Sequence, residues 1–198
     1  MVRTRVALAT ASIGSAIAMG SGGAGADPSR SFQIASSAFA NNGAIPIAHT
    51  CEGSNVSPPL EWSGAPSSAK TFALIVDDPD APDPSAPKLT FVHWVVYNLP
   101  ASAHSLPEGV RREVLPAGAV EGTNDAKRIG YSGPCPPIGR HRYFFKLYAL
   151  DTRLDGLKAP SKADLERAMK DHIVAKTELV GTYEKSAAEK KAGPGARN

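Results

Sequence analysis

The segment from Gly130 to Asp151 constrains the fold most, because it joins two very different kinds of backbone. Residues 130–140 contain three glycines and three prolines, which predict an irregular but stiff loop. The aromatic and aliphatic residues from His141 onward predict a strand, on which His141 and Tyr143 share one face. Backbone amides beside an imidazole and a phenol indicate an anion pocket.

The rest of the chain is also mostly β in pattern. Short apolar segments rich in β-branched and aromatic residues, separated by loops rich in Gly, Pro, Ser and Asn, predict strands at 32–39, 71–76, 91–98, 143–150 and 178–183. The run at 71–76 is almost continuously apolar, which is typical of a strand buried on both faces. Ser161 and Asp164 form a capping-box pattern and predict one helix from Ser161 to about Ala175.

Residues 1–26 have the pattern of an export signal. Arg3 and Arg5 precede an apolar, Ala-rich stretch, and Ala24-Gly25-Ala26 fits the small-residue cleavage rule. We therefore expect an exported protein, periplasmic or secreted, with no transmembrane segment after cleavage. The remaining chain divides into a single domain at 27–184 and a disordered polar tail at 185–198.

The charge of the chain argues against a nucleic-acid partner. Two of the 22 Lys and Arg residues lie in 1–26 and none of the 19 Asp and Glu residues does, so the rest carries a net charge of +1. Its basic residues are scattered among acidic ones, whereas a nucleic-acid-binding protein has a basic stripe or patch. The sequence also lacks the Gly-rich loops of nucleotide-binding motifs, so no cofactor is predicted.

Asp78 lies where the buried strand at 71–76 reaches the loop Asp78-Pro-Asp-Ala-Pro82. On that strand face, a carboxylate could orient a histidine or accept a hydrogen bond from a ligand amine. A simple turn is an alternative, since Asp and Pro are common turn residues. A calcium loop is disfavoured, because Asp83 and Leu89 stand where the EF-hand pattern needs Gly and Glu.

His93 and the two cysteines have both structural and functional interpretations. By simple alternation, His93 shares a strand face with Val95 and Tyr97, where a hydrogen-bonded core histidine is the common case. In an exported chain, Cys51 and Cys135 are most simply one disulfide. A zinc site that includes both cysteines is disfavoured, because paired ligand spacings are missing. We predict no metal.

A nucleophile is not apparent from the sequence. Gly130-Tyr-Ser-Gly-Pro134 has the outline of a nucleophile elbow, but its fifth residue is proline and the segment precedes a strand instead of a helix.

Three separated motifs together resemble the phosphatidylethanolamine-binding protein family, and in particular its bacterial, Raf-kinase-inhibitor-like branch. They are DPDAP at 78–82, FVHWVVYNLP at 91–100, and GPCPP with HRYFFKLYALD between 133 and 151. HTCEGSNVSPPLEW at 49–62 and LPAGAVEGTNDAKRIGY at 115–131 add to the resemblance, which covers about residues 32–183.

The resemblance implies a mostly β fold with a central antiparallel sheet, a second smaller sheet and few peripheral helices. It also implies a small pocket for phosphate-like anions. The ligand-binding residues that it implies are Asp78, Pro82, His93, Gly133, Pro134, His141 and Tyr143.

We expect non-catalytic binding of a small anion or phospholipid headgroup, with His93, His141, Tyr143 and the amides of the loop at 130–139 donating to it. Asp78 would orient an imidazole or accept from a ligand ammonium. A protein–protein regulator or enzyme inhibitor is the alternative, and a weak hydrolase is the third. Histidine donors predict tighter binding as the pH falls toward about 6.5.

Overall fold

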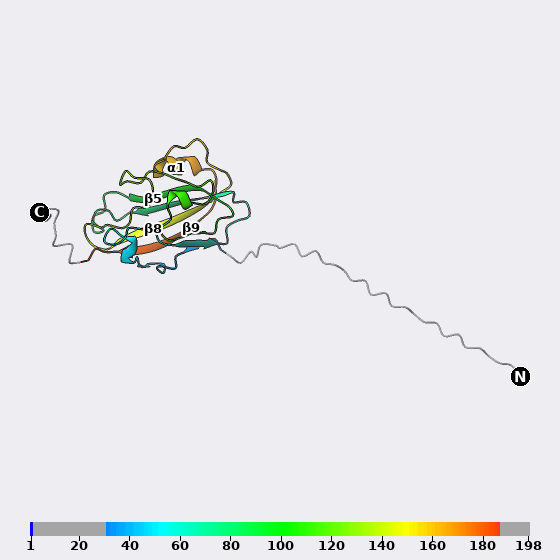
Figure 1. Ribbon diagram of the computed structural model, residues 1–198, viewed down its shortest axis with the longest axis horizontal. Coiled ribbons are helices and arrows are strands. Elements are labelled where there is room, and N and C mark those ends of the chain that lie inside the picture. Colours follow the sequence, from blue (N-terminus) through cyan, green and yellow to red (C-terminus); the bar gives the residue numbers. More distant parts are fainter. Residues whose placement is uncertain (2–30, 187–198) are drawn as a thin grey trace.

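Figure 1 shows the computed structural model, which describes Met1 and residues 31–186. Its centre is a six-stranded sheet with the order β2-β9-β8-β4-β5-β7. These strands are β2 (Gly43–Ala44), β4 (Thr71–Asp78), β5 (Phe91–Pro100), β7 (Val120–Glu121), β8 (His141–Leu150) and β9 (Ile173–Tyr183). All neighbouring pairs are antiparallel except β2 and β9, which run parallel.

A second, three-stranded sheet completes the β structure. It consists of β1 (Gln33–Ala35), β3 (Leu60–Ser63) and β6 (Ser105–Leu106), which pair antiparallel in the order β1-β3-β6. The predicted fold class, mostly β with one larger and one smaller sheet, is confirmed. The first predicted strand, at 32–39, is shorter than expected, since only Gln33–Ala35 pairs within a sheet.

The large sheet has a hydrophobic core on each face. Alternate side chains of β4 enter the two cores, with Phe72, Leu74 and Val76 on one side and Ala73 and Ile75 on the other. The first core includes the apolar residues of the small sheet, and the second includes apolar residues of the helix α1. Every residue of β4 is buried, as the continuous apolar run at 71–76 predicts.

The helix α1 (Lys162–Met169) lies over the second face of the large sheet, above β5 in Figure 1. Its capping box is present, because Ser161 and Asp164 each accept from the other's backbone amide. The helix is shorter than predicted, since β9 begins at Ile173 and pairs with β8 along its whole length. Strand pairing therefore overrides the helical spacing that predicted a helix to residue 175. Short 3₁₀ turns lie at Ile47–His49 and Arg112–Val114.

Two predicted terminal segments lie almost wholly outside the described residues. The export signal at 1–26 falls there apart from Met1, and the polar tail falls there from residue 187 onward. At the described start of that tail, Ser186 donates from its amide and its hydroxyl to the Glu52 carboxylate. Among the described residues, no helix is long and apolar enough to cross a membrane.

Candidate functional site

A pocket of about 280 Å³ opens beside three neighbouring strands, β8, β4 and β5. Its lining residues are Asp78, Ala81, Pro82, Leu89, Phe91, His93, Ser132, Gly133, Cys135, Pro136, Pro137 and His141. Five of the seven sequence-predicted site residues are among them, and Pro134 and Tyr143 are not. Of the lining residues that the sequence missed, Phe91 stands two positions before His93, and Pro136 and Pro137 continue the predicted proline wall.

Asp78 and His141 form the buried floor of the pocket. The last residue of β4 and the first residue of β8 come together, and His141 Nδ1 lies 2.7 Å from Asp78 Oδ2. Asp78 Oδ1 also accepts from the Asp80 amide at 2.8 Å. The expectation that Asp78 orients an imidazole therefore describes this contact, and the imidazole is that of His141.

Both ring nitrogens of His141 already have protein partners. Nε2 lies 2.9 Å from the Ile138 carbonyl oxygen, and Nδ1 faces Asp78. His141 is fully buried. A neutral imidazole has one N–H and can donate to one acceptor only. Hydrogen bonds to both Asp78 and the Ile138 carbonyl therefore require one further proton on the Asp78–His141 pair. With that proton, the pair has a net charge of zero. This arrangement differs from the expectation that His141 donates to a ligand, because neither nitrogen is left to do so.

His93 reaches the pocket because β5 contains a β-bulge. Val76 pairs with Trp94 and Asp77 pairs with Val92, so His93 is the extra residue between them. Its ring lies against Tyr143, which belongs to the core on the small-sheet side, whereas Val95 and Tyr97 belong to the opposite core. The prediction that His93 shares a face with Val95 and Tyr97 was therefore wrong, since the bulge breaks the simple alternation.

The orientation of the His93 ring is set by one hydrogen bond. Nδ1 lies 2.6 Å from the Ser132 carbonyl oxygen, which can only accept, so Nδ1 carries a proton. Nε2 is buried and has no partner among the described residues. Burial of the ring lowers the pKa of His93, against the opposing effect of the Ser132 hydrogen bond and of nearby carboxylates. The neutral ring therefore presents the lone pair of Nε2.

Tyr143 lies behind the lining residues. Its ring stacks against His141 at 6.4 Å and meets His93 edge-on at 5.2 Å, measured between ring centroids. The hydroxyl is buried and has no hydrogen-bond partner among the described residues. Burial, and then the charge of Asp78, raise the pKa of Tyr143, so the phenol stays protonated and is a potential donor beside Asp78.

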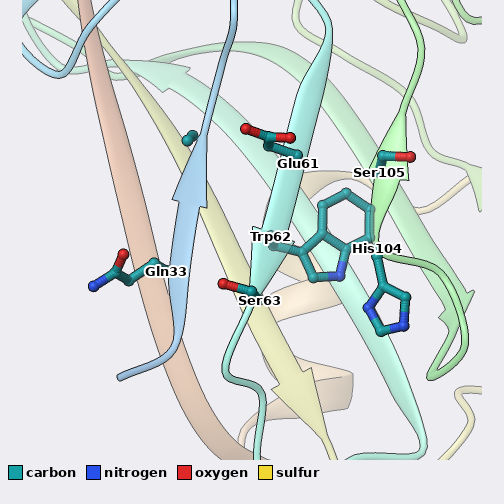
Figure 2. Close-up of a pocket in the computed structure, with 7 residues that line it drawn as sticks. Gln33, Glu61, Trp62, Ser63, His104 and Ser105 are labelled. Atoms are coloured by element: carbon teal, nitrogen blue, oxygen red, sulfur yellow. The ribbon is translucent and has the colours of Figure 1, made fainter. Parts of the chain in front are cut away.

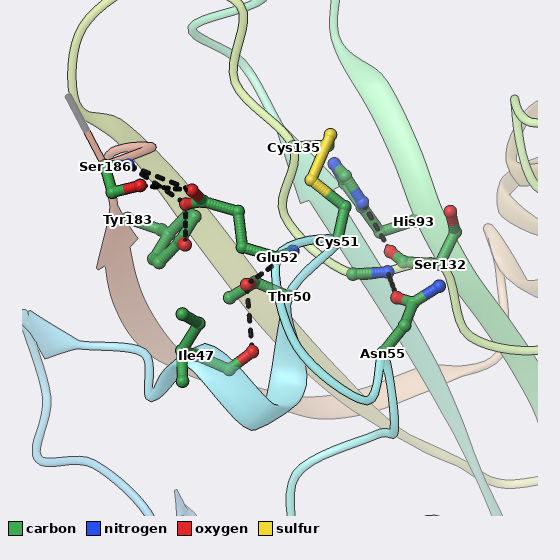
Figure 3. The surroundings of a disulfide bond; sticks show 11 residues. Ile47, Thr50, Cys51, Glu52, Asn55, His93, Ser132, Cys135, Tyr183 and Ser186 are labelled. Carbon is green, nitrogen blue, oxygen red and sulfur yellow. Dashed lines mark hydrogen bonds between the residues drawn. A yellow bond between two sulfur atoms is a disulfide. The ribbon is translucent and has the colours of Figure 1, made fainter. Parts of the chain in front are cut away.

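The Gly/Pro loop at 130–140 is held by contacts with the segment around Thr50 (Figure 3). The Gly133 amide donates to Asn55 Oδ1 at 2.7 Å, and the Ser132 amide donates to the His93 carbonyl. These two amides are thus engaged within the protein, contrary to the expectation that loop amides face the ligand. A Cβ at Gly133 would lie 2.5 Å from the His49 carbonyl oxygen, so this close approach requires glycine.

The predicted disulfide between Cys51 and Cys135 is confirmed. The two residues are 84 positions apart in sequence, and their Cα atoms lie 5.4 Å apart. Next to this bridge, the Cys51 amide donates to the Pro134 carbonyl, so Pro134 faces the segment around Thr50 and not the pocket. Figure 3 shows the disulfide beside His93, and Cys135 lines the pocket. The bridge therefore fixes one wall of the site.

The other acidic residues after β4 are engaged away from the pocket. Asp80 accepts from Arg142 at both carboxylate oxygens, at 2.7 and 2.9 Å, and this guanidinium lowers the pKa of Asp80. Asp83 accepts from the amide and hydroxyl of Ser85. The carboxylates of Asp78, Asp80 and Asp83 thus have separate protein partners, which is the structural reason for the turn in this segment.

A larger hollow, of about 540 Å³, lies on the small sheet and contains none of the predicted site residues. Figure 2 shows Glu61 and Ser63 beside Trp62 on β3, with His104 and Ser105 from the neighbouring segment. Glu61 and Ser63 are exposed and Trp62 is buried, as strand alternation requires. The hollow contains one buried polar atom without a partner among the described residues, Trp62 Nε1, whereas the pocket combines His93 Nε2 with the buried Asp78 and His141, so we place the candidate site at Asp78.

Known proteins support the family resemblance. A family model described as phosphatidylethanolamine-binding protein matches residues 35–184. A UPF0098 protein of Methanothermobacter thermautotrophicus is 49% identical over 147 residues, which cover 74% of this chain and 94% of the relative. A UPF0098 protein of Chlamydia trachomatis is 44% identical and covers 77% of this chain and 99% of its own length.

Two solved structures have the same fold. The structure of a phosphatidylethanolamine-binding protein homologue from Chlamydia trachomatis has a TM-score of 0.72 and 43% identity, covering 78% of this chain and 98% of that one. E. coli YbcL, described as a member of the mammalian family, has a TM-score of 0.71 and 36% identity, covering 78% and 99%. The chain therefore belongs to the phosphatidylethanolamine-binding protein family.

Proposed function

We propose that the protein binds phosphate-like anions, such as a phospholipid headgroup or a phosphorylated group, in the pocket at Asp78 and does not turn them over. The observation that carries this proposal is a pair of buried polar atoms without partners in the described part of the chain, His93 Nε2 and the Tyr143 hydroxyl. Native proteins leave few such atoms unpaired, and an unpaired buried group costs about 1–3 kcal/mol. A phosphate-like ligand that carries a P–O–H group would supply both missing partners, because its hydroxyl donates to Nε2 and its ionised oxygen accepts from the Tyr143 hydroxyl.

The walls of the pocket support a small ligand with one polar end. Pro82, Leu89, Phe91, Pro136 and Pro137 are apolar and surround a floor made by Asp78 and the two histidines. A volume of about 280 Å³ is near the lower end of the range for small-molecule sites. It suits a phosphoryl group with a short substituent, and a ligand ammonium would find a carboxylate in Asp78.

The hydrogen bonds of the Asp78–His141 pair favour binding over catalysis. A general base needs a ring nitrogen that can take a proton from a nucleophile. In His141, Nδ1 is bonded to Asp78 and Nε2 to the Ile138 carbonyl, so the ring has no nitrogen to offer. A weak hydrolase would need His93 alone to act as the base. We therefore propose a non-catalytic binder.

Isothermal titration with phosphoethanolamine, for wild type and Tyr143→Phe, tests this function. Loss of a hydrogen bond to a charged ligand should weaken binding roughly 10- to 100-fold, while the aromatic ring stays in place. Tyr148→Phe is the matched control, since Tyr148 lies on the same strand in the opposite core region. No heat with folded wild-type protein, or equal affinity in Tyr143→Phe, would contradict the proposal.

A protein partner is the second candidate, because large apolar side chains are exposed at the pocket. Leu89, which lines the pocket, is 51% exposed, and Ile138, next to the lining residue Pro137, is 54% exposed. If this rim binds a protein, complex formation should fail in the double variant Leu89→Ser/Ile138→Ser and survive in Tyr143→Phe. Gel filtration with cell-envelope extracts would separate these outcomes. A complex unaffected by both variants would remove this candidate.

We also propose that the protein is exported to the periplasm or beyond the cell. The signal pattern at 1–26 and the Cys51–Cys135 disulfide support this localisation, since disulfides persist in oxidising compartments. N-terminal sequencing of the protein from fractionated cells should begin at Asp27 and should find the protein outside the cytoplasmic fraction. An intact N-terminus in the cytoplasmic fraction would contradict export.

A further inference from the structure

The pocket floor contains more hydrogen-bond acceptors than donors. The His93 ring is held with its proton on Nδ1 by the Ser132 carbonyl, so a neutral ring presents an acceptor at Nε2. Asp78 has the acceptor oxygens of a carboxylate, and each oxygen receives one donor from the protein. The donors beside these groups are neutral hydroxyls: that of Tyr143, behind the lining residues, and that of Ser132, which lines the pocket. An oxyanion that can only accept hydrogen bonds does not match this set.

The net charge of the floor gives a fully ionised anion no compensating attraction. Hydrogen bonds at both His141 nitrogens require one additional proton on the Asp78–His141 pair, so the pair is neutral overall. The neighbouring cation Arg142 is bound to Asp80 by two hydrogen bonds. A dianion, whether sulfate or hydrogen phosphate, would thus enter a buried floor without a net positive charge, so hydrogen bonds decide between the two ions.

We propose that the pocket selects oxyanions that carry their own proton, such as hydrogen phosphate, over fully ionised ones such as sulfate. The P–O–H group donates to His93 Nε2, and an unprotonated oxygen of the same ligand accepts from the Tyr143 hydroxyl. This inference rests on the proposed anion-binding function and narrows its ligand class for the same pocket to phosphate and phosphomonoesters, because the diester phosphate of a phospholipid headgroup has no P–O–H group. His93 is the specificity-determining residue.

Sulfate has no proton to donate, and its oxygens would meet the Nε2 lone pair and the Asp78 carboxylate. A site built to pair with a ligand hydroxyl strongly disfavours an analogue that lacks it, because the buried polar groups are then left unpaired. The two ions have the same tetrahedral shape, so size does not distinguish them. We expect sulfate to bind roughly 10- to 100-fold more weakly than phosphate.

The surroundings of His93 keep its ring neutral near pH 7. Asp78 and Asp77 of β4 and Asp125, which follows β7, favour the charged ring, and His141 and Tyr143 of β8 also face it. Burial outweighs these carboxylates and lowers the pKa of His93, so the ring remains an acceptor under these conditions. Protonation of the ring at lower pH would turn Nε2 into a donor and would remove the selectivity.

Competition titrations with inorganic phosphate and sodium sulfate near pH 7.5 test the inference, since phosphate keeps a P–O–H group at that pH and sulfate has none. Wild-type protein should prefer phosphate by roughly 10-fold or more. His93→Phe keeps a ring but removes the acceptor, and should bring the two affinities within about 3-fold. His104→Phe, at an exposed histidine of the small sheet, should leave the ratio unchanged.

A second measurement uses wild-type protein alone. Phosphoethanolamine gains its P–O–H group only as the pH falls through about 6, whereas inorganic phosphate has one throughout. Its affinity should rise clearly between about pH 8 and about pH 6, while that of phosphate changes much less. Equal binding of sulfate and phosphate by the wild type, or an equal rise for both phosphates, would overturn the selectivity and leave the anion-binding function standing. Binding of phosphoethanolamine without binding of phosphate would also overturn it, and no binding of any of them would refute the function itself.

Discussion

Asp78 Oδ2 and His141 Nδ1 lie 2.7 Å apart and join the end of β4 to the start of β8 in the buried floor of the pocket. The side chains are 5% and 0% exposed, so the pair is shielded from water. The Ile138 carbonyl accepts from the other nitrogen of His141, which connects the pair to the Gly/Pro loop. The bond therefore has a structural role in addition to its place in the site.

Removing the Asp78 carboxylate should destabilise the protein. In Asp78→Ala the buried His141 Nδ1 loses its partner, and the expected cost is roughly 3–5 kcal/mol in the free energy of unfolding. Asp78→Asn keeps an acceptor oxygen and should cost less. Urea denaturation measures both. Asp155→Ala is the control, since the side chain of Asp155 is 80% exposed and its ion pair should contribute less than about 1 kcal/mol. Equal stability of Asp78→Ala and wild type would contradict the structural role.

An ion cluster centred on the buried Asp77 attaches α1 to the large sheet. Asp77 is fully buried on the face opposite Asp78 and accepts from Lys146 at 2.9 Å and from Lys162, in the first turn of α1, at 2.6 Å. Lys162→Met should therefore loosen the helix and lower the free energy of unfolding by about 1–3 kcal/mol. In Lys162→Met, hydrogen exchange in α1 should be faster than in wild type, whereas exchange in β4 should change less. Lys170→Met, at an exposed position after the helix, should have no such effect.

The low pKa of His93 makes stability depend on pH. The unfolded chain takes up a proton at this residue near pH 6.5, whereas the folded protein does so only at lower pH, because the ring is buried. The contribution of His93 to the free energy of unfolding is thus fully present above about pH 6.5. It is lost as the pH falls from about 6.5 to the pKa of His93 in the folded protein. The slope is at most about 1.4 kcal/mol per pH unit.

Urea denaturation at several pH values tests this dependence. The comparison is between wild type and His93→Phe, since the other histidines contribute equally to both. Between about pH 6.5 and about pH 5, the free energy of unfolding should fall more steeply with decreasing pH in wild type than in His93→Phe. At higher pH the two proteins should have equal slopes. Parallel pH profiles for the two proteins would show that His93 is not held neutral by burial.

The Cys51–Cys135 disulfide should be a major source of stability. It joins residues that are 84 positions apart in the sequence. By restricting the unfolded chain, a bridge across this separation raises the free energy of unfolding by roughly 4 kcal/mol. The double variant Cys51→Ser/Cys135→Ser should lose about that amount in urea denaturation. Because Cys135 lines the pocket, the variant should also bind phosphoethanolamine more weakly. A reducing agent should reproduce both effects in wild type and change nothing in the double variant. A wild type insensitive to complete reduction would contradict this account.

The fold class and much of the site followed from local patterns in the sequence. The continuous apolar run at 71–76 predicted a strand buried on both faces, and the change from Gly/Pro-rich loop to aromatic strand at His141 marked the pocket. The capping box located the start of α1. These features depend on side-chain periodicity and on the backbone preferences of single residues, which are properties of short segments.

Tertiary structure decided the features that depend on pairing between distant segments. The β-bulge in β5 turns His93 toward Tyr143, and the full pairing of β9 with β8 ends the helix early. The hydrogen-bonding role of each histidine also emerged only in the fold. Nδ1 of His93 meets Ser132, and both nitrogens of His141 meet protein oxygens. Residue types determine which groups can donate or accept. The packing of segments 39 and 63 positions apart in the sequence determines which partners these groups meet.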